Sequence, residues 1–453
     1  MIAYGGYFMI TVKSNTAILA FVVICCGIIV LDSIVLSLFA STPREPARIV
    51  TLLLFEGISA FFIFSSYVFL RSFRQKDDSF LPDRKIFKVS RLLKRIVTLN
   101  QLTLCCLVGS IAISVAIFGA FVTQTLLIII YVSYVGAIGF LLFLSYHLFR
   151  WFKSFRNYPI LLYGLAFSLI IVGLIMSIAY LTMALSYYDP ILKMKRIRAA
   201  LVTVQSPTSG MSSLSTIYTY LSPIAFVLIW IPTMVQLKKY STIIGSGKYW
   251  VLVAIPLVYY FFPLVADEFG IFDSLRLDYG SQFNLVYAIF FSPYRQVGGL
   301  LFGIVFWITA LKVKRTDLRL MLQMAGTGMI LLFGSTVLHG LSHIVAPPFG
   351  IIMISFTALA AYLVTIGLYT SAIILSTDSV VLKDVKKLVK KDASLLHGMG
   401  SAELRSELER TVVTVTKKHQ EEMAKLSGVS TSINEDDIKQ YLDQALREIK
   451  EKK

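Results

Sequence analysis

The stretch FGIIMISFTALAAYLVTIGLYTSAIIL, residues 349–375, decides the class of fold because it is long, apolar and uncharged. About 20 apolar residues in a helix suffice to cross the hydrocarbon layer of a membrane. After Ser376 the sequence becomes polar, and SVVLKDVKKLVKK follows at residues 379–391. We therefore expect a transmembrane domain at residues 1–376 and a helical cytoplasmic tail at residues 377–453.

The charge distribution separates these two regions. Residues 1–376 hold 28 Lys and Arg against 12 Asp and Glu, a net charge of +16, whereas residues 377–453 hold 15 against 14, a net charge of +1. The chain as a whole is 56% hydrophobic. In such a chain, basic loop residues that follow the positive-inside rule explain the positive charge better than nucleic-acid binding does. The expected partner of the first region is the lipid bilayer.

Apolar segments divided by polar loops predict an all-α, polytopic transmembrane helix bundle with ten spans. The eighth span is the weakest, because Pro293 and Arg295 interrupt the apolar sequence just before it. The loop at residues 189–215 could divide two halves, 1–188 and 216–376, although no residue-level repeat supports them. The predicted spans are 16–40, 48–70, 97–121, 124–149, 159–186, 216–236, 249–266, 296–311, 320–340 and 348–375.

Loop charges predict the orientation. If the spans alternate, 20 Lys and Arg fall on the side of the N-terminus and eight fall on the other side. This bias places both termini in the cytoplasm of a multi-pass protein of the cell membrane. Trp151 and Trp250 fall at predicted cytoplasmic boundaries, where aromatic rings favour the headgroup level.

Two carboxylates, Asp32 and Glu56, fall well inside predicted spans, and each is 12 residues from Arg44 in the intervening turn. In an antiparallel helix pair they would therefore lie at similar depth. A carboxylate inside a membrane is costly, so it is paired, protonated or exposed to a wet cavity. These two residues are candidates for a proton or cation site, against the alternative of one protonated acid bonded between helices.

A metal site is the second candidate. His339 and His343 are spaced i, i+4, which places both rings on one helix face, and Asp267 and Glu268 fall in a loop on the same predicted side. Imidazole and carboxylate could bind a divalent metal, but histidines bonded to backbone or water explain the spacing equally simply.

Motifs of catalysis are missing from the sequence. There is no glycine-rich phosphate loop and no nucleophile elbow, so we expect neither an enzyme nor a cofactor. The four cysteines occur as adjacent pairs, Cys25-Cys26 and Cys105-Cys106, inside apolar segments, as buried thiols do.

The tail sequence predicts helices. Five lysines follow the last span and predict a linker or membrane-surface helix that continues the span, with the first break at HGMG, residues 397–400. Apolar residues at helical spacing in residues 401–453 predict a surface for a protein partner or for self-association. The five lysines are Lys383, Lys386, Lys387, Lys390 and Lys391.

The segments GLYTSAIILSTDSVVLKDVKKLVKK, ELRSELERTV and GVSTSINEDDIKQYLDQALREIK resemble uncharacterised polytopic membrane proteins of ammonia-oxidising archaea, some of them sensor-like. The resemblance covers the last quarter of the chain, and no kinase region follows. Together with the continuous last span, it favours signal relay or partner docking through the tail. The alternatives are a secondary transporter that uses Asp32 and Glu56, motivated by spans interrupted at Pro223, Pro232, Pro256 and Pro263, and a structural subunit of a membrane complex.

Overall fold

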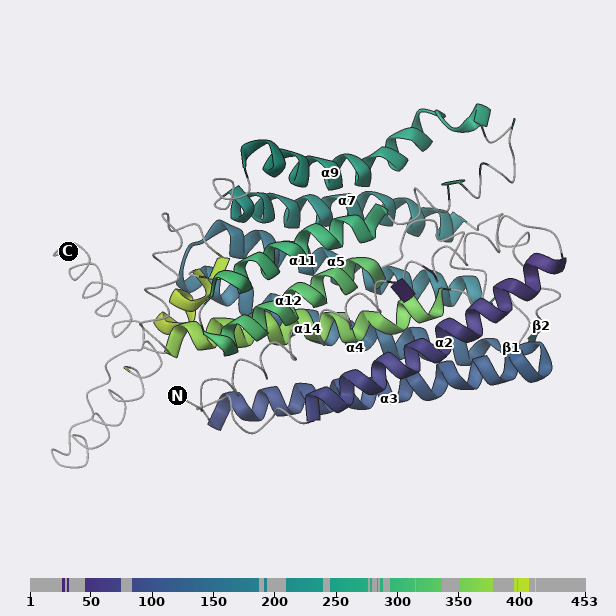
Figure 1. Ribbon diagram of the computed structural model, residues 1–453, viewed down its shortest axis with the longest axis horizontal. Coiled ribbons are helices and arrows are strands. Elements are labelled where there is room, and N and C mark those ends of the chain that lie inside the picture. Colours follow the sequence, from purple (N-terminus) through teal and green to yellow (C-terminus); the bar gives the residue numbers. More distant parts are fainter. Residues whose placement is uncertain are drawn as a thin grey trace, which may run out of the picture. The chain divides into compact units, whose positions relative to one another are not determined.

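The computed structural model shows a helical protein (Figure 1). The structure describes most of the chain between Glu45 and Thr377 and a short part of the tail. The described residues are 27–28, 31, 45–74, 84–186, 191–193, 209–238, 245–275, 278, 283, 286–287, 294–313, 315–335, 350–377, 395–396, 398–406 and 412.

Nine long helices account for nearly all of the described residues. Their bounds are α2 Glu45–Arg74, α3 Arg84–Phe118, α4 Thr123–Ser154, α5 Tyr158–Ser186, α7 Ser209–Lys238, α9 Ser246–Glu268, α11 Tyr294–Lys312, α12 Thr316–Ser335 and α14 Ile351–Thr377. The all-α class is therefore confirmed, with one addition that the sequence did not predict. Two short strands, β1 (Ala120–Val122) and β2 (Ile191–Lys193), pair antiparallel, with Phe121 opposite Leu192.

Seven of these helices are long and apolar enough to cross a membrane, namely α3, α4, α5, α7, α9, α12 and α14. The apolar parts of α2 (Leu52–Val68) and α11 (Val297–Lys312) are shorter. The predicted first span lies almost entirely outside the described residues. The structure therefore supports a multi-pass membrane protein but leaves the number ten as a prediction.

The expected interruptions at proline do not occur. α7 continues through Pro223 and Pro232, and α9 continues through Pro256 and Pro263. Neighbouring helices and local adjustments can satisfy the backbone groups that a proline frees in a membrane helix, so such helices persist. The predicted spans 216–236 and 249–266 are therefore continuous helices, and their prolines do not make them discontinuous.

Two compact units divide the chain. The first consists of Met1–Tyr146 and Leu162–Tyr369, and the second consists of His147–Leu161 and Thr370–Lys453. Helices α4, α5 and α14 contribute residues to both units.

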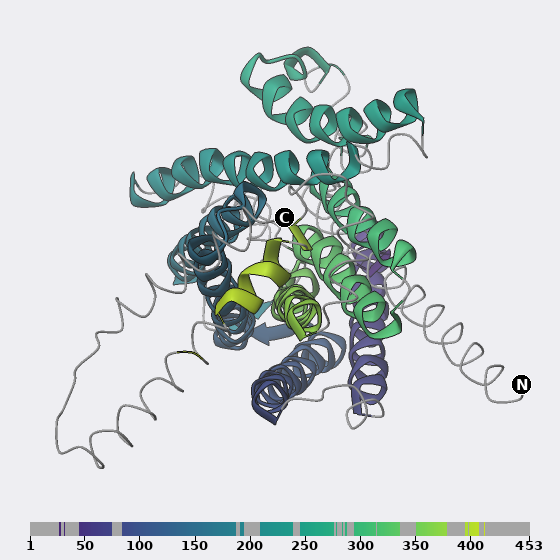
Figure 2. The same cartoon turned by 90° about the vertical axis from the view of Figure 1, so that its left-hand side faces the viewer.

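Within the first unit, α14 is the inner helix. Almost every residue of α14 is buried, including hydroxyl groups such as Ser355 and Thr357. Figure 2, which looks along α14, shows the other helices of the unit around it. An apolar helix enclosed on all sides has no amphipathic face, and the sequence of α14 accordingly lacks one.

Contacts from two helices, α4 and α2, hold α14. Ser133 of α4 donates to the carbonyl of Ile354, and the Thr365 hydroxyl donates to the carbonyl of Phe140, also on α4, at 3.1 Å. Phe62 of α2 packs edge-on against Phe356, with ring centroids 4.9 Å apart. Hydroxyl bonds of this kind between membrane helices contribute about 0.6 kcal/mol on average.

Glycines bring α12 close to both of its neighbours. A Cβ atom on Gly367 of α14 would lie 2.6 Å from the backbone nitrogen of Ala325, and one on Gly328 would lie 2.5 Å from that of Val364. On the α11 side, a Cβ on Gly303 would lie 2.6 Å from the carbonyl oxygen of Gly326. Small residues are the usual means of close backbone packing in membranes. The backbones of α11, α12 and α14 therefore fit against one another with no room for a side chain at these points.

A second packing centre joins α7, α9, α11 and α12. The buried ring of Phe226 stacks on Tyr260 with centroids 3.9 Å apart, and it also contacts Phe302 and Phe333. This aromatic cluster holds α9, whose opposite face is exposed at Trp250 and Val258 as expected for a lipid-facing helix.

Candidate functional site

The second unit contains a short helical part of the tail, which we call the tail segment: residues 395–396 and 398–406. These residues are helical, and the apolar side chains of Leu395, Leu396, Met399 and Ala402 are buried. They repeat at i, i+1, i+4 and i+7, which is one face of a helix. The predicted break was therefore wrong over residues 398–400, while residue 397 lies outside the described residues; burial of this face outweighs the poor helix propensity of glycine.

The tail segment is bonded to the end of α4. The indole Nε1–H of Trp151 donates to Oε2 of Glu403 at 2.6 Å, and Nη2 of Arg150 donates to Oγ of Ser406 at the same distance. In each pair one partner carries charge, and charge-assisted bonds are shorter and stronger than neutral ones. Two consecutive residues of α4 thus hold two residues of the tail segment that are three apart, on one helical face.

Close backbone packing accompanies these bonds. Asn157 is the last residue of the turn between α4 and α5, and its carbonyl accepts from the backbone N–H of Ile160 at 3.1 Å. A Cβ on Gly398 would lie 2.9 Å from Cγ of Asn157 and 3.0 Å from Cδ1 of Ile160. A side chain at position 398 would therefore force the Asn157 and Ile160 side chains to move, whereas glycine lets the tail segment lie directly against them.

Sequence reasoning missed this docking site, and the expectation for Trp151 was wrong. Trp151 has no exposed surface, so it is not an anchor at the headgroup level, whereas Trp250 is largely exposed. The available signal was the basic run around Arg150 and the acidic residues around Glu403. The sequence alone did not pair them because they are more than 250 residues apart.

Of the two carboxylates predicted to form a site, only Glu56 lies among the described residues. Glu56 lies on α2, and its Oε1 is buried with no hydrogen-bond partner among the described residues. Asp32 lies outside the described residues, so the predicted proximity of the two acids stays a prediction.

Only two of the four candidate metal ligands, Asp267 and Glu268, lie among the described residues. Glu268 is exposed at the end of α9, and Asp267 is the residue before it. His339 and His343 lie outside the described residues, as do the five lysines Lys383, Lys386, Lys387, Lys390 and Lys391. Among the residues that the structure describes, no group of three His, Cys, Asp or Glu side chains could hold a metal ion.

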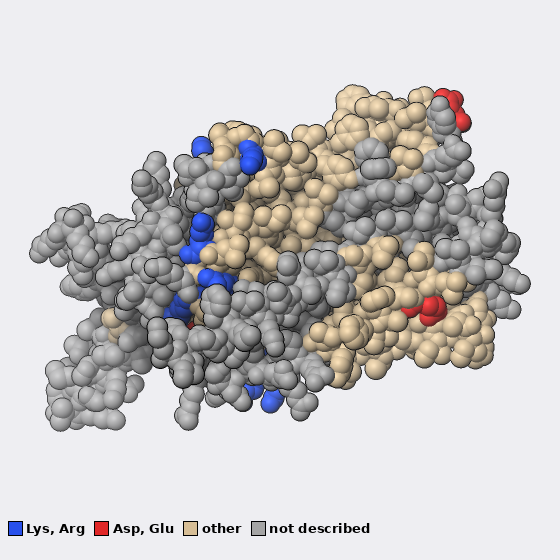
Figure 3. Space-filling view, in the orientation of Figure 1, with Lys and Arg blue, Asp and Glu red and all other residues tan. Residues whose placement is uncertain are grey.

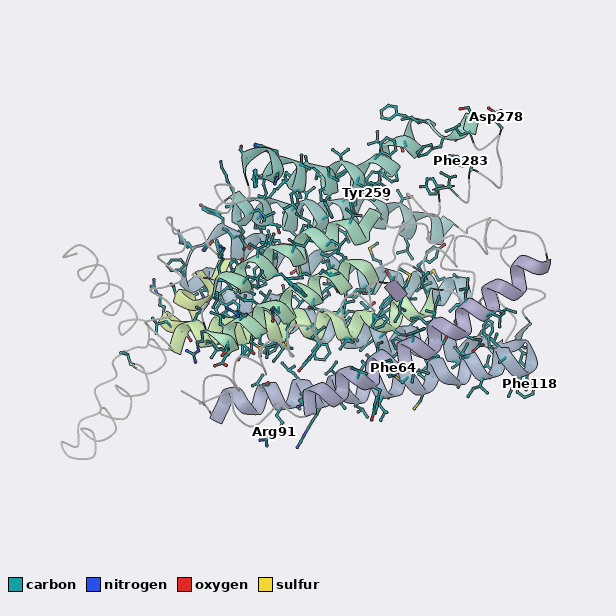
Figure 4. All side chains as sticks on the ribbon, viewed as in Figure 1. Phe64, Arg91, Phe118, Tyr259, Asp278 and Phe283 are labelled. Atoms are coloured by element: carbon teal, nitrogen blue, oxygen red, sulfur yellow. The ribbon has the colours of Figure 1, made fainter. Side chains whose placement is uncertain are left out.

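Charges on the first unit separate by helix end. Lys and Arg occur at the first turns of α3, α9 and α12 and at the last turns of α7 and α11, whereas Glu268, Asp273 and Asp278 follow the other end of α9. Figure 3 shows the basic and acidic side chains at opposite ends of the face it displays. In Figure 4, Arg91 lies at one end of α3 and Phe118 at the other. Lys and Arg therefore gather at one end of most described helices, with exceptions at Asp317 in the first turn of α12 and Arg295 in the first turn of α11.

Comparisons with protein-family models, with curated proteins and with solved structures found no match to this chain. The class of protein accordingly rests on the molecule itself, whose apolar helices define a multi-pass membrane protein.

Proposed function

We propose that this chain is a membrane signal-relay protein in which the helix bundle controls a docked cytoplasmic tail. The observation that carries the proposal is the tail segment, which is held on α4 through Trp151–Glu403 and Arg150–Ser406. A tail that only tethered a partner would need no bonds to the bundle helices. A tail that reports on the bundle needs bonds that can be made and released.

Helix α4 supplies a route to the tail segment. Its residue Phe140 accepts the bond from Thr365 of α14, and its residue Trp151 bonds the tail segment. These two residues are 11 positions apart on one continuous helix, or about 16 Å along its axis. A change that moves α14 thus acts on the helix that holds the tail segment, in addition to the covalent connection after Thr377.

The separation of charge supports the orientation in this proposal. Excess Lys and Arg mark the cytoplasmic side of a multi-pass protein. Helix α4 ends among basic residues, with Lys153 in its last turn, so the docking site and the tail belong to the cytoplasmic side. Output from residues 401–453 to a protein partner, or to a second copy of this chain, would then occur in the cytoplasm.

The test compares two glycine variants of similar severity. Gly367→Ala forces α14 away from α12, whereas Gly303→Ala forces α11 away from α12. Hydrogen exchange of residues 395–406 is then measured by mass spectrometry in purified protein. The relay predicts faster exchange in Gly367→Ala and unchanged exchange in Gly303→Ala. Equal effects in both variants, or no effect in either, would contradict it.

The partner is tested separately. Purification of the full chain in mild detergent should retain a cytoplasmic protein or a second copy that is lost when residues 401–453 are deleted. If the same proteins remain after the deletion, the tail is not the output element.

A transporter is the second candidate, and one observation favours it. Oε1 of Glu56 is buried and has no hydrogen-bond partner among the described residues, and intramembrane carboxyls of this kind mark proton and ion pathways. Purified protein in liposomes should then catalyse an ion or substrate flux that Glu56→Gln abolishes while the fold is retained. The unbroken α7 and α9 remove the earlier argument from discontinuous helices.

A further inference from the structure

A polar stripe runs along α2 on the side that packs against α3. It consists of Glu56, Ser59 and Ser66, spaced i, i+3 and i+10, with the apolar Ile63 at i+7 on the same helix face. Contacts with α3 fix its direction, since Oγ of Ser66 accepts from Nε2 of Gln101 at 2.8 Å. Ile63 lies opposite Gly109, where an added Cβ would meet its Cδ1 at 3.6 Å.

Three oxygens in this interface are buried and have no hydrogen-bond partner among the described residues: Oε1 of Glu56, Oγ of Ser59 and Oε1 of Gln101. Ser59 and Gln101 are almost completely buried. A buried polar group without a partner is destabilising, so such groups in native proteins call for an explanation, such as a bound occupant. A carboxylate oxygen and an amide oxygen only accept hydrogen bonds, so the occupant must be a hydrogen-bond donor, a bound proton or a cation.

Their separation along the helix axis divides these oxygens into two groups. Glu56 and Ser59 are one turn apart, about 4.5 Å along the axis. Ser66 and Gln101 lie about 10 Å further along, beyond Ile63. The residue between them on this face is the apolar Ile63, so the polar stripe is interrupted there.

We propose that Glu56 and Ser59 form a closed proton-binding site between α2 and α3. The interruption at Ile63 means that the proton is bound and released on one side without crossing the protein. Glu56 lies one turn inside the apolar part of α2, which begins at Leu52. Proton exchange with water therefore occurs at the N-terminal end of α2. The proposal rests on the same carboxyl as the transporter candidate, but it requires no transport.

A metal ion fits the site less well than a proton does. Hard cations such as Ca²⁺ need six to eight oxygens at about 2.3–2.6 Å. Glu56 and Ser59 supply at most three side-chain oxygens, and Ser66 and Gln101 lie about 10 Å further along the stripe. A neutral carboxyl, by contrast, needs no counter-charge and removes the cost of a charge at membrane depth.

The described residues of α3 and α14 bring no compensating cation near Glu56. The described basic residues of α3 end at Arg95, and Gln101, which lies beyond Arg95 on α3, already bonds Ser66 ten positions away from Glu56. No described residue of α14 is charged. The remaining titratable groups on the helices packed against α2 are Cys105 and Cys106 on α3 and Tyr362 and Tyr369 on α14.

Infrared difference spectroscopy tests the site directly. Purified protein in lipid should show the carbonyl stretch of a protonated carboxyl that appears as the pH falls and is absent in Glu56→Gln. The matched control is Glu268→Gln, which removes an exposed carboxyl at the end of α9 and should leave that band in place. If Glu56→Gln does not fold, Glu56→Asp should shift the band. A spectrum unchanged by substitution of Glu56 would overturn the proposal.

Flux measurements separate this proposal from transport. Liposomes with a pH-sensitive dye inside and an imposed K⁺ potential should show no proton uptake through the wild-type protein. Uptake that Glu56→Gln abolishes would overturn the closed site in favour of the transporter. The relay is tested independently by hydrogen exchange of residues 395–406, so its failure would leave the proton site standing.

Discussion

Glu403→Ala is the most direct perturbation of the docked tail segment. The substitution removes the carboxylate that accepts from the fully buried Trp151 indole at 2.6 Å. A hydrogen bond to a charged group contributes about 1.5–3 kcal/mol, and Glu403 keeps some exposure to water, so the lower part of the range applies. Undocking should therefore become easier by about 1–2 kcal/mol.

Hydrogen exchange measures this change. Because about 1.4 kcal/mol corresponds to a factor of ten in an equilibrium constant, amides of residues 398–406 should exchange roughly 5- to 30-fold faster in Glu403→Ala. Glu403→Gln keeps an acceptor oxygen but loses the charge, so its effect should be smaller. Glu268→Ala removes an exposed carboxylate elsewhere and serves as the control. Exchange of the tail segment that is equal in Glu403→Ala and in the control would refute the docking argument.

Three further predictions concern the bundle. Gly303→Ala should lower the melting temperature measured in detergent, because its Cβ would lie 2.6 Å from the Gly326 carbonyl oxygen and overpacking of this kind costs about 1–3 kcal/mol. Thr365→Val, which keeps the shape but loses the bond to Phe140, should cost less, about 0.6 kcal/mol in the same assay. For orientation, a cysteine replacing Glu268 should react with a membrane-impermeant maleimide on intact cells, and a cysteine replacing Lys153 only after the cells are opened; the reverse pattern would invert the proposed topology.

Much of the helix arrangement could be predicted from the sequence. The predicted span 159–186 corresponds to α5 at Tyr158–Ser186, and 124–149 corresponds to α4, which continues to Ser154. Long uncharged segments have few alternatives to a helix in a membrane, because every backbone polar group must be satisfied within the segment. Even the doubtful eighth span is the helix α11, although its apolar part is short.

The docking site could not be predicted, and the reasons are physical. Gly398 and Gly400 are poor helix formers, and only the burial of neighbours such as Met399 makes this part of the tail helical. Trp151 has the composition expected of an interfacial anchor, and its actual role depends on a carboxylate far along the chain. Tertiary contacts of this kind leave no periodic signal in either segment.

The glycine contacts also limit how a relay through α14 can operate. Gly367 and Gly328 place the backbones of α14 and α12 in direct contact, with no space for a Cβ on either. Adjacent residues of a helix point about 100° apart, so a rotation of α14 by one position would turn a side chain into the α12 backbone. Sliding of α14 alone would break two bonds with α4: the one that Thr365 of α14 donates to α4, and the one that Ser133 of α4 donates to α14. The movement that remains is a shift of α14 together with α4 and α12, and since α4 also holds the tail segment at Trp151, such a shift changes the docking site itself.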